Sequence, residues 1–196
     1  MQKTYKWIFL LIVPAAAAQA DPITFKISEG GGNLIQFESK APLETITGVT
    51  DQVEGTITLD PLNLADGVSA LIVVDAASLK TGNKIRDGHM RDNHLHTDQF
   101  PKITFALSNL TLEGALQDNV PRDFQVVGDF FLHGVINTIA VPVQVTWIQK
   151  ETERKLHVQG AFSVALSDHR IPRPQFLVMK LDEVQKITVD FWGVAP

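Results

Sequence analysis

Cysteine is absent from this 196-residue sequence. Its absence excludes disulfide frameworks, thiolate metal sites, cysteine nucleophiles and lipidation of an N-terminal cysteine. Basic residues are also few, with 17 Lys and Arg against 22 Asp and Glu, which leaves a formal net charge of −5. Because nucleic-acid binding depends on Lys and Arg that neutralise phosphates, this balance argues against a nucleic-acid partner.

Long hydrophobic runs are missing as well. The run at 7–13 is too short to span a bilayer, which takes about 20 residues. Lys3 and Lys6 precede it, and the small-x-small sequence 18–20 follows it. This arrangement is typical of a cleaved secretory signal peptide, which we predict for residues 1–20, with export to a bacterial periplasm. The alternative for this segment is a membrane anchor.

Cleavage would leave one domain at 21–196 and would change both charge and aromatic content. The leader contains two Lys and no acidic residue, so 15 basic and 22 acidic residues would remain, a net charge of −7. Tyr5 is the only tyrosine, and it lies in the leader. Barrels that span outer membranes carry aromatic girdles at both interfaces, so we expect no stable membrane insertion.

Apolar and polar residues alternate along most of the remaining chain. Such alternation over five or more residues is the signature of half-buried antiparallel strands, and turn residues separate the segments. Closing eight such strands into a barrel removes the edge strands. We therefore predict an all-β fold, an eight-stranded antiparallel barrel whose interior is filled by side chains or holds one small ligand. The segments are 23–27, 53–59, 68–74, 103–107, 124–132, 141–147, 162–166 and 187–191.

Two stretches interrupt the alternation. Residues 76–99 are polar and charged, and we expect one or two short helices there, capping one end of the barrel. Residues 167–182 contain Pro172 and Pro174, which cannot donate to a strand ladder, so we predict a loop.

The first of these stretches resembles a known family signature. Thr81-Gly82-Asn83, Arg86-Asp87-Gly88-His89 and Phe100-Pro101-Lys102-Ile103-Thr104-Phe105 match a T-G-N, R-D-x-H, F-P-x-I-T-F pattern. Further agreement lies at Val126 to Val135, Val141-Pro142-Val143 and Asp182-Glu183-Val184. On these residues the mature chain resembles the YceI-like family of exported, polyisoprenoid-binding proteins. The chain departs from that pattern at Leu34 to Ser39, which has no His, and at Arg170, where Gly is common.

The resemblance implies a lipocalin-like barrel that sequesters or carries one isoprenoid chain in the periplasm. The lipid would be a polyprenyl phosphate or an isoprenoid quinone, and the role would be lipid binding, with a link to stress. It implies no catalysis, no catalytic residues and no cofactor. An edge left open between the first and last strands would favour a homodimer.

The candidate residues for lining the lipid tail are apolar members of the alternating segments. The sequence leaves open which alternating set faces the lumen, and a solid core is the alternative to a hollow barrel. The tail-lining candidates are Phe25, Ile57, Ile72, Phe105, Phe130, Val143, Trp147, Phe162 and Phe191.

The candidate residues for a head group or cap lie in the helical stretch. Arg makes bidentate, charge-assisted hydrogen bonds to phosphate, which suits a polar head group at the barrel mouth. The alternative is a structural pair in which Arg86 binds Asp87 or Asp98 and fastens the cap. The head-group or cap candidates are Arg86, Asp87, His89, Arg91 and His94.

Histidines supply the rival functional hypothesis, a metal-dependent or acid–base enzyme that uses residues 89–96. Imidazole and carboxylate groups suit zinc, but His89 and His94 are five residues apart, not the four that share a helix face. We therefore expect no metal site. Ser167-Asp168-His169 has the letters of a triad, yet adjacent residues cannot take its geometry. His133, before Gly134, is expected to be a hydrogen-bonded turn residue.

Overall fold

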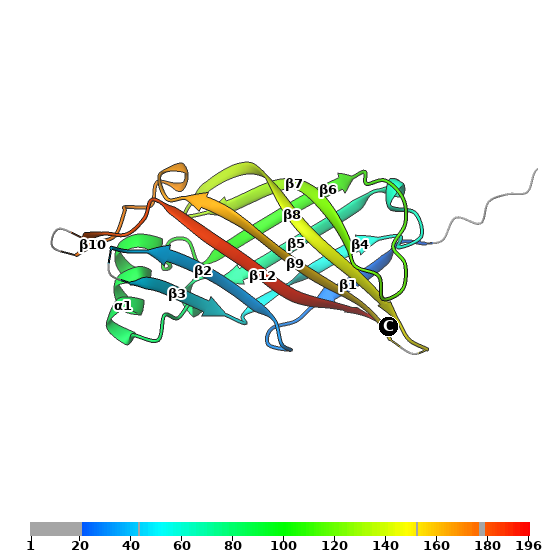
Figure 1. Ribbon diagram of the computed structural model, residues 1–196, viewed down its shortest axis with the longest axis horizontal. Coiled ribbons are helices and arrows are strands. Elements are labelled where there is room, and N and C mark those ends of the chain that lie inside the picture. Colours follow the sequence, from blue (N-terminus) through cyan, green and yellow to red (C-terminus); the bar gives the residue numbers. More distant parts are fainter. Residues whose placement is uncertain (1–20, 43, 152, 177–178) are drawn as a thin grey trace, which may run out of the picture.

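The computed structural model describes residues 21–42, 44–151, 153–176 and 179–196. The predicted signal peptide at 1–20 lies outside the described residues. Figure 1 shows an elongated barrel with α1 at one end and the C-terminus at the other. These are called the capped end and the closed end below. Within the described ranges, no helix is long and apolar enough to cross a membrane.

Eight antiparallel strands form the barrel, and the first pairs with the last through Lys26 and Val194. The predicted eight-stranded barrel is therefore confirmed, and each predicted alternating segment lies in one of its strands, except that Leu166 follows the end of β9. In barrel order the strands are β1 (Ile23–Ile27), β4 (Val53–Leu59), β5 (Val68–Asp75), β6 (Lys102–Leu110), β7 (Arg122–Leu132), β8 (Val135–Gln149), β9 (Arg154–Ala165) and β12 (Val184–Ala195).

A further hairpin extends the sheet beside β12. It consists of β2 (Leu34–Lys40) and β3 (Thr45–Thr50), which were not among the predicted segments. Five-residue β1 pairs with the C-terminal end of twelve-residue β12, and β2 pairs with the N-terminal part of β12 at 186–190. Val49 of β3 bridges to Lys80 near the cap. The hairpin therefore completes the wall at the capped end, where β1 does not reach.

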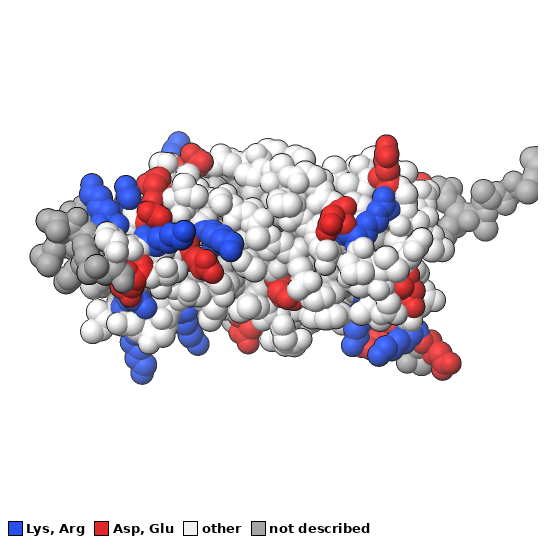
Figure 2. Space-filling model, in the orientation of Figure 1, with Lys and Arg blue, Asp and Glu red and all other residues white. Residues whose placement is uncertain are grey.

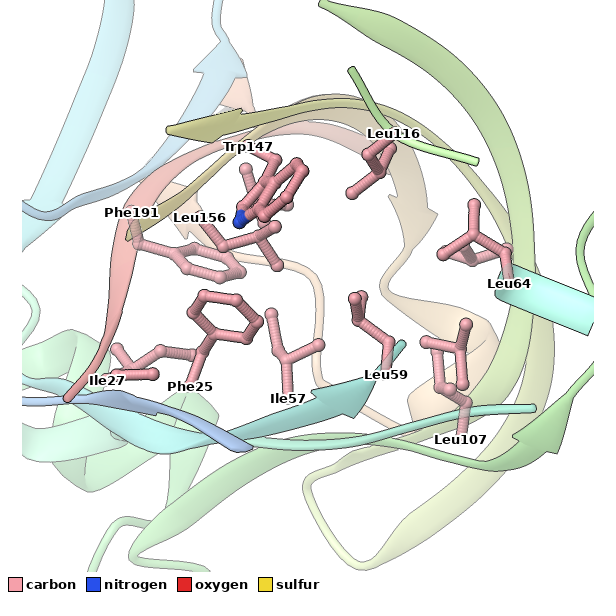
Figure 3. Close-up of a cluster of buried hydrophobic side chains, with 14 of the residues drawn as sticks. Phe25, Ile27, Ile57, Leu59, Leu64, Leu107, Leu116, Trp147, Leu156 and Phe191 are labelled. Carbon is pink, nitrogen blue, oxygen red and sulfur yellow. The ribbon is translucent and has the colours of Figure 1, made fainter. Parts of the chain in front are cut away.

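The closed end is packed with large side chains. Figure 3 shows Phe25, Trp147 and Phe191 among the apolar side chains that converge there from several strands. Leu64 of η1 (Leu64–Asp66) and Leu116 of the β6–β7 connection are 1% and 2% exposed, so they seal this end. Their loops are tied together, because the amide of Leu64 donates to the carbonyl oxygen of Gly114 at 3.0 Å and that of Leu116 to Pro61 at 2.7 Å.

Short helices cover the opposite end, as predicted. They are η2 (Ala76–Ser78), α1 (Lys84–His89) and the π-helical η3 (Met90–Leu95). The side chain of Asn83 begins α1, because its Oδ1 accepts hydrogen bonds from the amides of Ile85 and Arg86. The α1 and η3 segments are continuous and form one compact cap.

The predicted loop at 167–182 contains more structure than expected. It begins with η4 (Ser167–His169), and after the two prolines β10 (Gln175–Phe176) pairs with β11 (Met179–Lys180). Proline lacks an amide donor, so this two-residue ladder begins only after Pro174.

Candidate functional site

The barrel is hollow. A cavity of about 850 Å³ runs inside it, from Ile85 and Met90 of the cap to Leu64, Leu112 and Leu116 at the closed end. This volume is within the range of ligand pockets, about 300–1,000 Å³. The cavity wall is mostly aliphatic and aromatic, and several of its polar side chains lie toward the cap, among them Asn83, Arg86 and His94. The arrangement suits a long apolar molecule with its polar end at the cap.

Seven of the nine tail-lining candidates belong to the cavity wall. They come from seven different barrel strands, which shows that one alternating set points inward around the whole circumference. The seven are Ile57, Ile72, Phe105, Phe130, Val143, Phe162 and Phe191.

The other two candidates, Phe25 and Trp147, are not among the residues of the cavity wall. Both point inward, but Phe25 is 0% exposed and Trp147 is 7% exposed, because both are packed in the same cluster of buried hydrophobic side chains at the closed end. Inward direction is set by alternation along a strand, whereas access to the cavity depends on depth along the barrel. The sequence pattern carries the first kind of information only.

Several wall residues were missed because the β2–β3 hairpin was not among the alternating segments from which the tail-lining candidates were chosen. Ile35, Phe37 and Ser39 of β2 line the cavity, and so does Gln185 of β12. The first three share one parity, so extending the alternation test to 34–40 could have found them. Ser39 and Gln185 are polar, and a search for apolar positions passes over such residues.

Arg86 lies in the wall at the cap, but its donors are engaged in the fold. Its Nε donates to Thr81 Oγ1 at 2.8 Å and its Nη2 to the carbonyl oxygen of Thr81 at 3.1 Å. Its Nη1 lies 3.8 Å from Glu44 Oε2 on the β2–β3 connection. The structural alternative paired Arg86 with Asp87 or Asp98. In the structure Arg86 instead contacts Thr81 and Glu44. Arg86 therefore fastens the cap to the hairpin.

Asp87 is buried beneath the cap and is not in the cavity wall. Its Oδ1 accepts hydrogen bonds from the Thr81 amide at 2.8 Å and the Thr81 hydroxyl at 2.6 Å. Burial by itself would raise the pKa of Asp87, but these bonds and the positive charges of Arg91 and Arg86 outweigh it and lower the pKa below its usual value. Asp87 is thus a structural anion of the cap.

The remaining cap candidates take different positions. His89 is exposed and lines the cavity, whereas Arg91 is half-buried outside the wall. His94 lines the cavity, and its Nδ1 lies 2.8 Å from the carbonyl oxygen of Pro172, so Nδ1 carries the hydrogen and donates. Burial lowers the pKa of His94, which favours the neutral ring.

A chain of histidines joins the cap to the barrel. Nδ1 of His96 lies 2.8 Å from Nε2 of His133, and Nδ1 of His133 donates to the carbonyl oxygen of His169 at 2.9 Å. His169 is 2% exposed, its Nδ1 donates to the carbonyl oxygen of Leu132 at 3.3 Å, and burial lowers its pKa. His133 is a hydrogen-bonded residue of the β7–β8 turn, as expected.

The histidines proposed for the enzyme hypothesis do not converge. His94 bonds to Pro172 and His96 to His133, so these two rings are directed to different neighbours. Nowhere in the described ranges do three His, Asp or Glu side chains gather as a metal site would require. His169 faces Leu132 and Asn137 rather than Ser167, and the three residues 167–169 therefore do not form a triad.

Solved structures share this fold at low sequence identity. A polyisoprenoid-binding domain from Saccharophagus degradans, implicated in plant cell wall breakdown, is 16% identical, with a TM-score of 0.68 over 89% of this chain and 99% of that one. BcnA from Burkholderia cenocepacia is 19% identical, with a TM-score of 0.65 over 82% and 95%. The YceI protein of Campylobacter jejuni is 15% identical, with a TM-score of 0.63 over 77% and 85%.

The sequence comparison gives the family. Among curated proteins none matches this sequence significantly. The YceI-like domain, however, matches residues 24–191, which begin in β1, end in β12 and include the whole cap. With the barrel, the helical cap and the signature segment at 81–105 all in place, this chain belongs to the YceI-like domain family.

Proposed function

We propose that this protein is a lipid-binding protein that holds one isoprenoid chain inside its barrel. The observation that carries the proposal is the 850 Å³ apolar cavity, sealed at one end and reaching the cap at the other. Burying one methylene contributes about 0.8 kcal/mol, so each five-carbon unit contributes about 4 kcal/mol before the cost of association. The polyisoprenoid-binding domain from Saccharophagus degradans, which shares the fold, supports the same ligand class.

The proposed setting is the bacterial periplasm, reached through the signal peptide at 1–20. A polyprenyl phosphate or an isoprenoid quinone has no other apolar shelter in that aqueous space, so sequestering or carrying it, in a role linked to stress, is the task we assign. The protein acts by binding rather than by catalysis, and it needs no cofactor for this.

We place the route of lipid entry at the capped end. Ile85 of α1 is 73% exposed and also lines the cavity, so it offers an apolar surface that continues from solvent into the lumen. Met90 and Leu95 of η3 line the cavity behind it. Among the described residues, the closed end offers no comparable path, because Leu64 and Leu116 seal it.

We also propose a homodimer, but not one formed through an open edge between the first and last strands. The pairing of β1 with β12 closes the barrel, so that edge is absent. Exposed apolar side chains instead lie on the outer face, with Leu71 at 47%, Val127 at 46% and Ile136 at 64%. Figure 2 shows few charged side chains over the middle of the barrel. Analytical ultracentrifugation with Ile136→Lys tests this face, and a dimer that persists in that variant contradicts it.

The test of lipid binding uses two matched tryptophan substitutions. Val143→Trp places a large ring in the cavity wall on β8, and Val127→Trp places the same ring on the outer face of β7. We expect Val143→Trp to weaken the binding of an isoprenoid alcohol at least tenfold and Val127→Trp to leave it unchanged, as measured by native mass spectrometry titration. Equal affinity in both variants would show that the lipid does not occupy the barrel.

A further inference from the structure

Ser39 carries a buried hydroxyl without a hydrogen-bond partner. The residue is 2% exposed, lies on β2 and forms part of the cavity wall. In the described part of the chain, two buried side-chain polar atoms lack a partner, Ser39 Oγ and Trp147 Nε1. An unpaired buried polar group destabilises a fold, so each of these atoms requires an explanation.

The two unpaired atoms differ in what can reach them. Trp147 packs in the closed end and takes no part in the cavity wall. Ser39 belongs to the wall, and its hydroxyl can turn between staggered positions about the Cα–Cβ bond. Ser39 Oγ is itself covered as the side chain stands, so a molecule in the cavity can pair with it when the side chain turns toward the lumen. Trp147 Nε1 lies outside the wall and offers no such access.

A second polar side chain lies beside Ser39 on the inward face. Lys186 of β12 pairs with Glu38 of β2, so the next residues along these antiparallel strands, Gln185 and Ser39, are cross-strand neighbours. Gln185 is 8% exposed and lines the cavity, and its Nε2 donates to the carbonyl oxygen of Asp182 at 2.6 Å. That bond orients the amide and leaves its Oε1 as an acceptor that does not pair with the Ser39 hydroxyl.

The wall around this pair is apolar. Ile46 of β3 pairs with Ser39, Val164 of β9 pairs with Gln185, and both apolar residues line the cavity. The other polar wall residue of these two strands, Gln36 of β2, has the opposite parity to Ser39, and its Nε2 donates to Glu38 Oε1 at 3.1 Å. Ser39 and Gln185 therefore form a local polar notch in a mostly hydrophobic surface. Ser39 lies on β2 two residues before Ala41, which lines the cavity from the β2–β3 connection at the capped end.

The charged groups nearest the capped end are already paired or exposed. Glu44 neutralises Arg86, whose Nε and Nη2 are bound to Thr81. Lys180, another cation of the wall, is exposed to solvent. The notch therefore presents an uncharged donor and an uncharged acceptor, which suit a neutral oxygen better than a phosphate.

We propose that Ser39 and Gln185 form a polar subsite that hydrogen-bonds an uncharged oxygen of the lipid, a hydroxyl or a carbonyl. The subsite positions that oxygen near the capped end while the chain extends toward Leu64 and Leu116. It selects such a lipid over the phosphate ester of the same chain. This inference rests on the proposed function, because the oxygen is placed there by a chain that fills the barrel.

The test compares three ligands of one chain length: an isoprenoid alcohol, its phosphate monoester and the hydrocarbon. Each is titrated into the full protein and into Ser39→Ala, with Ser163→Ala as the matched control, because Ser163 is exposed on β9. We expect Ser39→Ala to weaken alcohol binding about fivefold, the value of one net hydrogen bond, and to leave hydrocarbon binding unchanged. Ser163→Ala is expected to change neither.

Thermal unfolding supplies an independent readout. Ser39→Ala removes an unpaired buried hydroxyl, so its midpoint without added lipid should equal or exceed that of the unchanged protein, while its affinity for the alcohol falls. Gln185→Met, which keeps the length of the side chain, should also weaken alcohol binding more than hydrocarbon binding. A purely structural role for Ser39 would lower the midpoint and weaken both ligands alike.

The outcomes separate this inference from the proposed function. If alcohol and hydrocarbon bind but Ser39→Ala weakens both equally or neither, the subsite is refuted and lipid binding stands. A phosphate ester that binds tenfold more tightly than the alcohol also refutes the subsite. If none of the three ligands binds, the proposed function is refuted, and the subsite with it.

Discussion

Replacing Asp87 should loosen the cap by an amount that follows from its contacts. Oδ1 accepts two hydrogen bonds from Thr81, and Arg86 Nε donates to the same Thr81 hydroxyl, so one carboxylate holds a three-residue network. Hydrogen bonds to charged groups contribute about 1.5–3 kcal/mol each, and water can reach half-buried Thr81 and replace part of that. We therefore expect Asp87→Ala to lower the free energy of unfolding by about 2–3 kcal/mol.

The measurement is the thermal unfolding midpoint followed by circular dichroism. At about 2–4 °C per kcal/mol for a domain of this size, Asp87→Ala should lower the midpoint by about 4–12 °C. Asp87→Asn retains an acceptor oxygen and should give a smaller loss. Asp92→Asn, at an exposed position on η3, is the control and should remain within about 0.5 kcal/mol of the unchanged protein. Equal midpoints for Asp87→Ala and Asp92→Asn would refute the reasoning.

Three further predictions concern the closed end, the histidines and the cavity wall. Phe25→Ala should cost about 3–5 kcal/mol in urea unfolding yet leave lipid affinity unchanged, because Phe25 is 0% exposed and outside the cavity wall; a parallel loss of affinity contradicts this. Burial lowers the pKa of His94 and His169, so the unfolded chain binds more protons, and stability should fall as pH drops below about 6.5; an unchanged urea midpoint between pH 7.5 and 5.5 contradicts this. In Gly48→Ala the added Cβ would lie 2.1 Å from Phe37 Cε1, so the ring must shift, and native mass spectrometry should show a changed preference for lipid chain length; an unchanged preference contradicts this.

The barrel was predictable because alternation reports directly on strands. Each of the eight segments had enough apolar residues in one parity to show a half-buried strand, and the cap was visible as the stretch at 76–99 without alternation. The β2–β3 hairpin was missed because its inward set includes Ser39 and Gly48. Polar or small residues in the wall weaken the contrast between apolar and polar positions from which a strand is predicted.

For the candidate site, the sequence predicted which residues alternate as apolar sets, but neither which set faces the lumen nor how deep each residue lies in the barrel. Alternation placed Phe25 and Phe105 in apolar sets and left open which set faces the lumen. The three-dimensional packing shows that both point inward, and that Phe25 lies in the packed closed end and Phe105 in the cavity wall. The role of Arg86 was likewise undetermined, because its partner Glu44 is distant in sequence and lies in the β2–β3 connection.

The central claim is that the barrel interior holds one isoprenoid lipid. Native mass spectrometry of the mature protein, purified from the cells that produce it without exposure to detergent, tests this most directly. The account predicts one bound species per chain, with the mass of an isoprenoid lipid, which Val143→Trp loses and Val127→Trp retains. A protein that is recovered empty, and that also refuses added isoprenoid alcohols, quinones and polyprenyl phosphates, would contradict it.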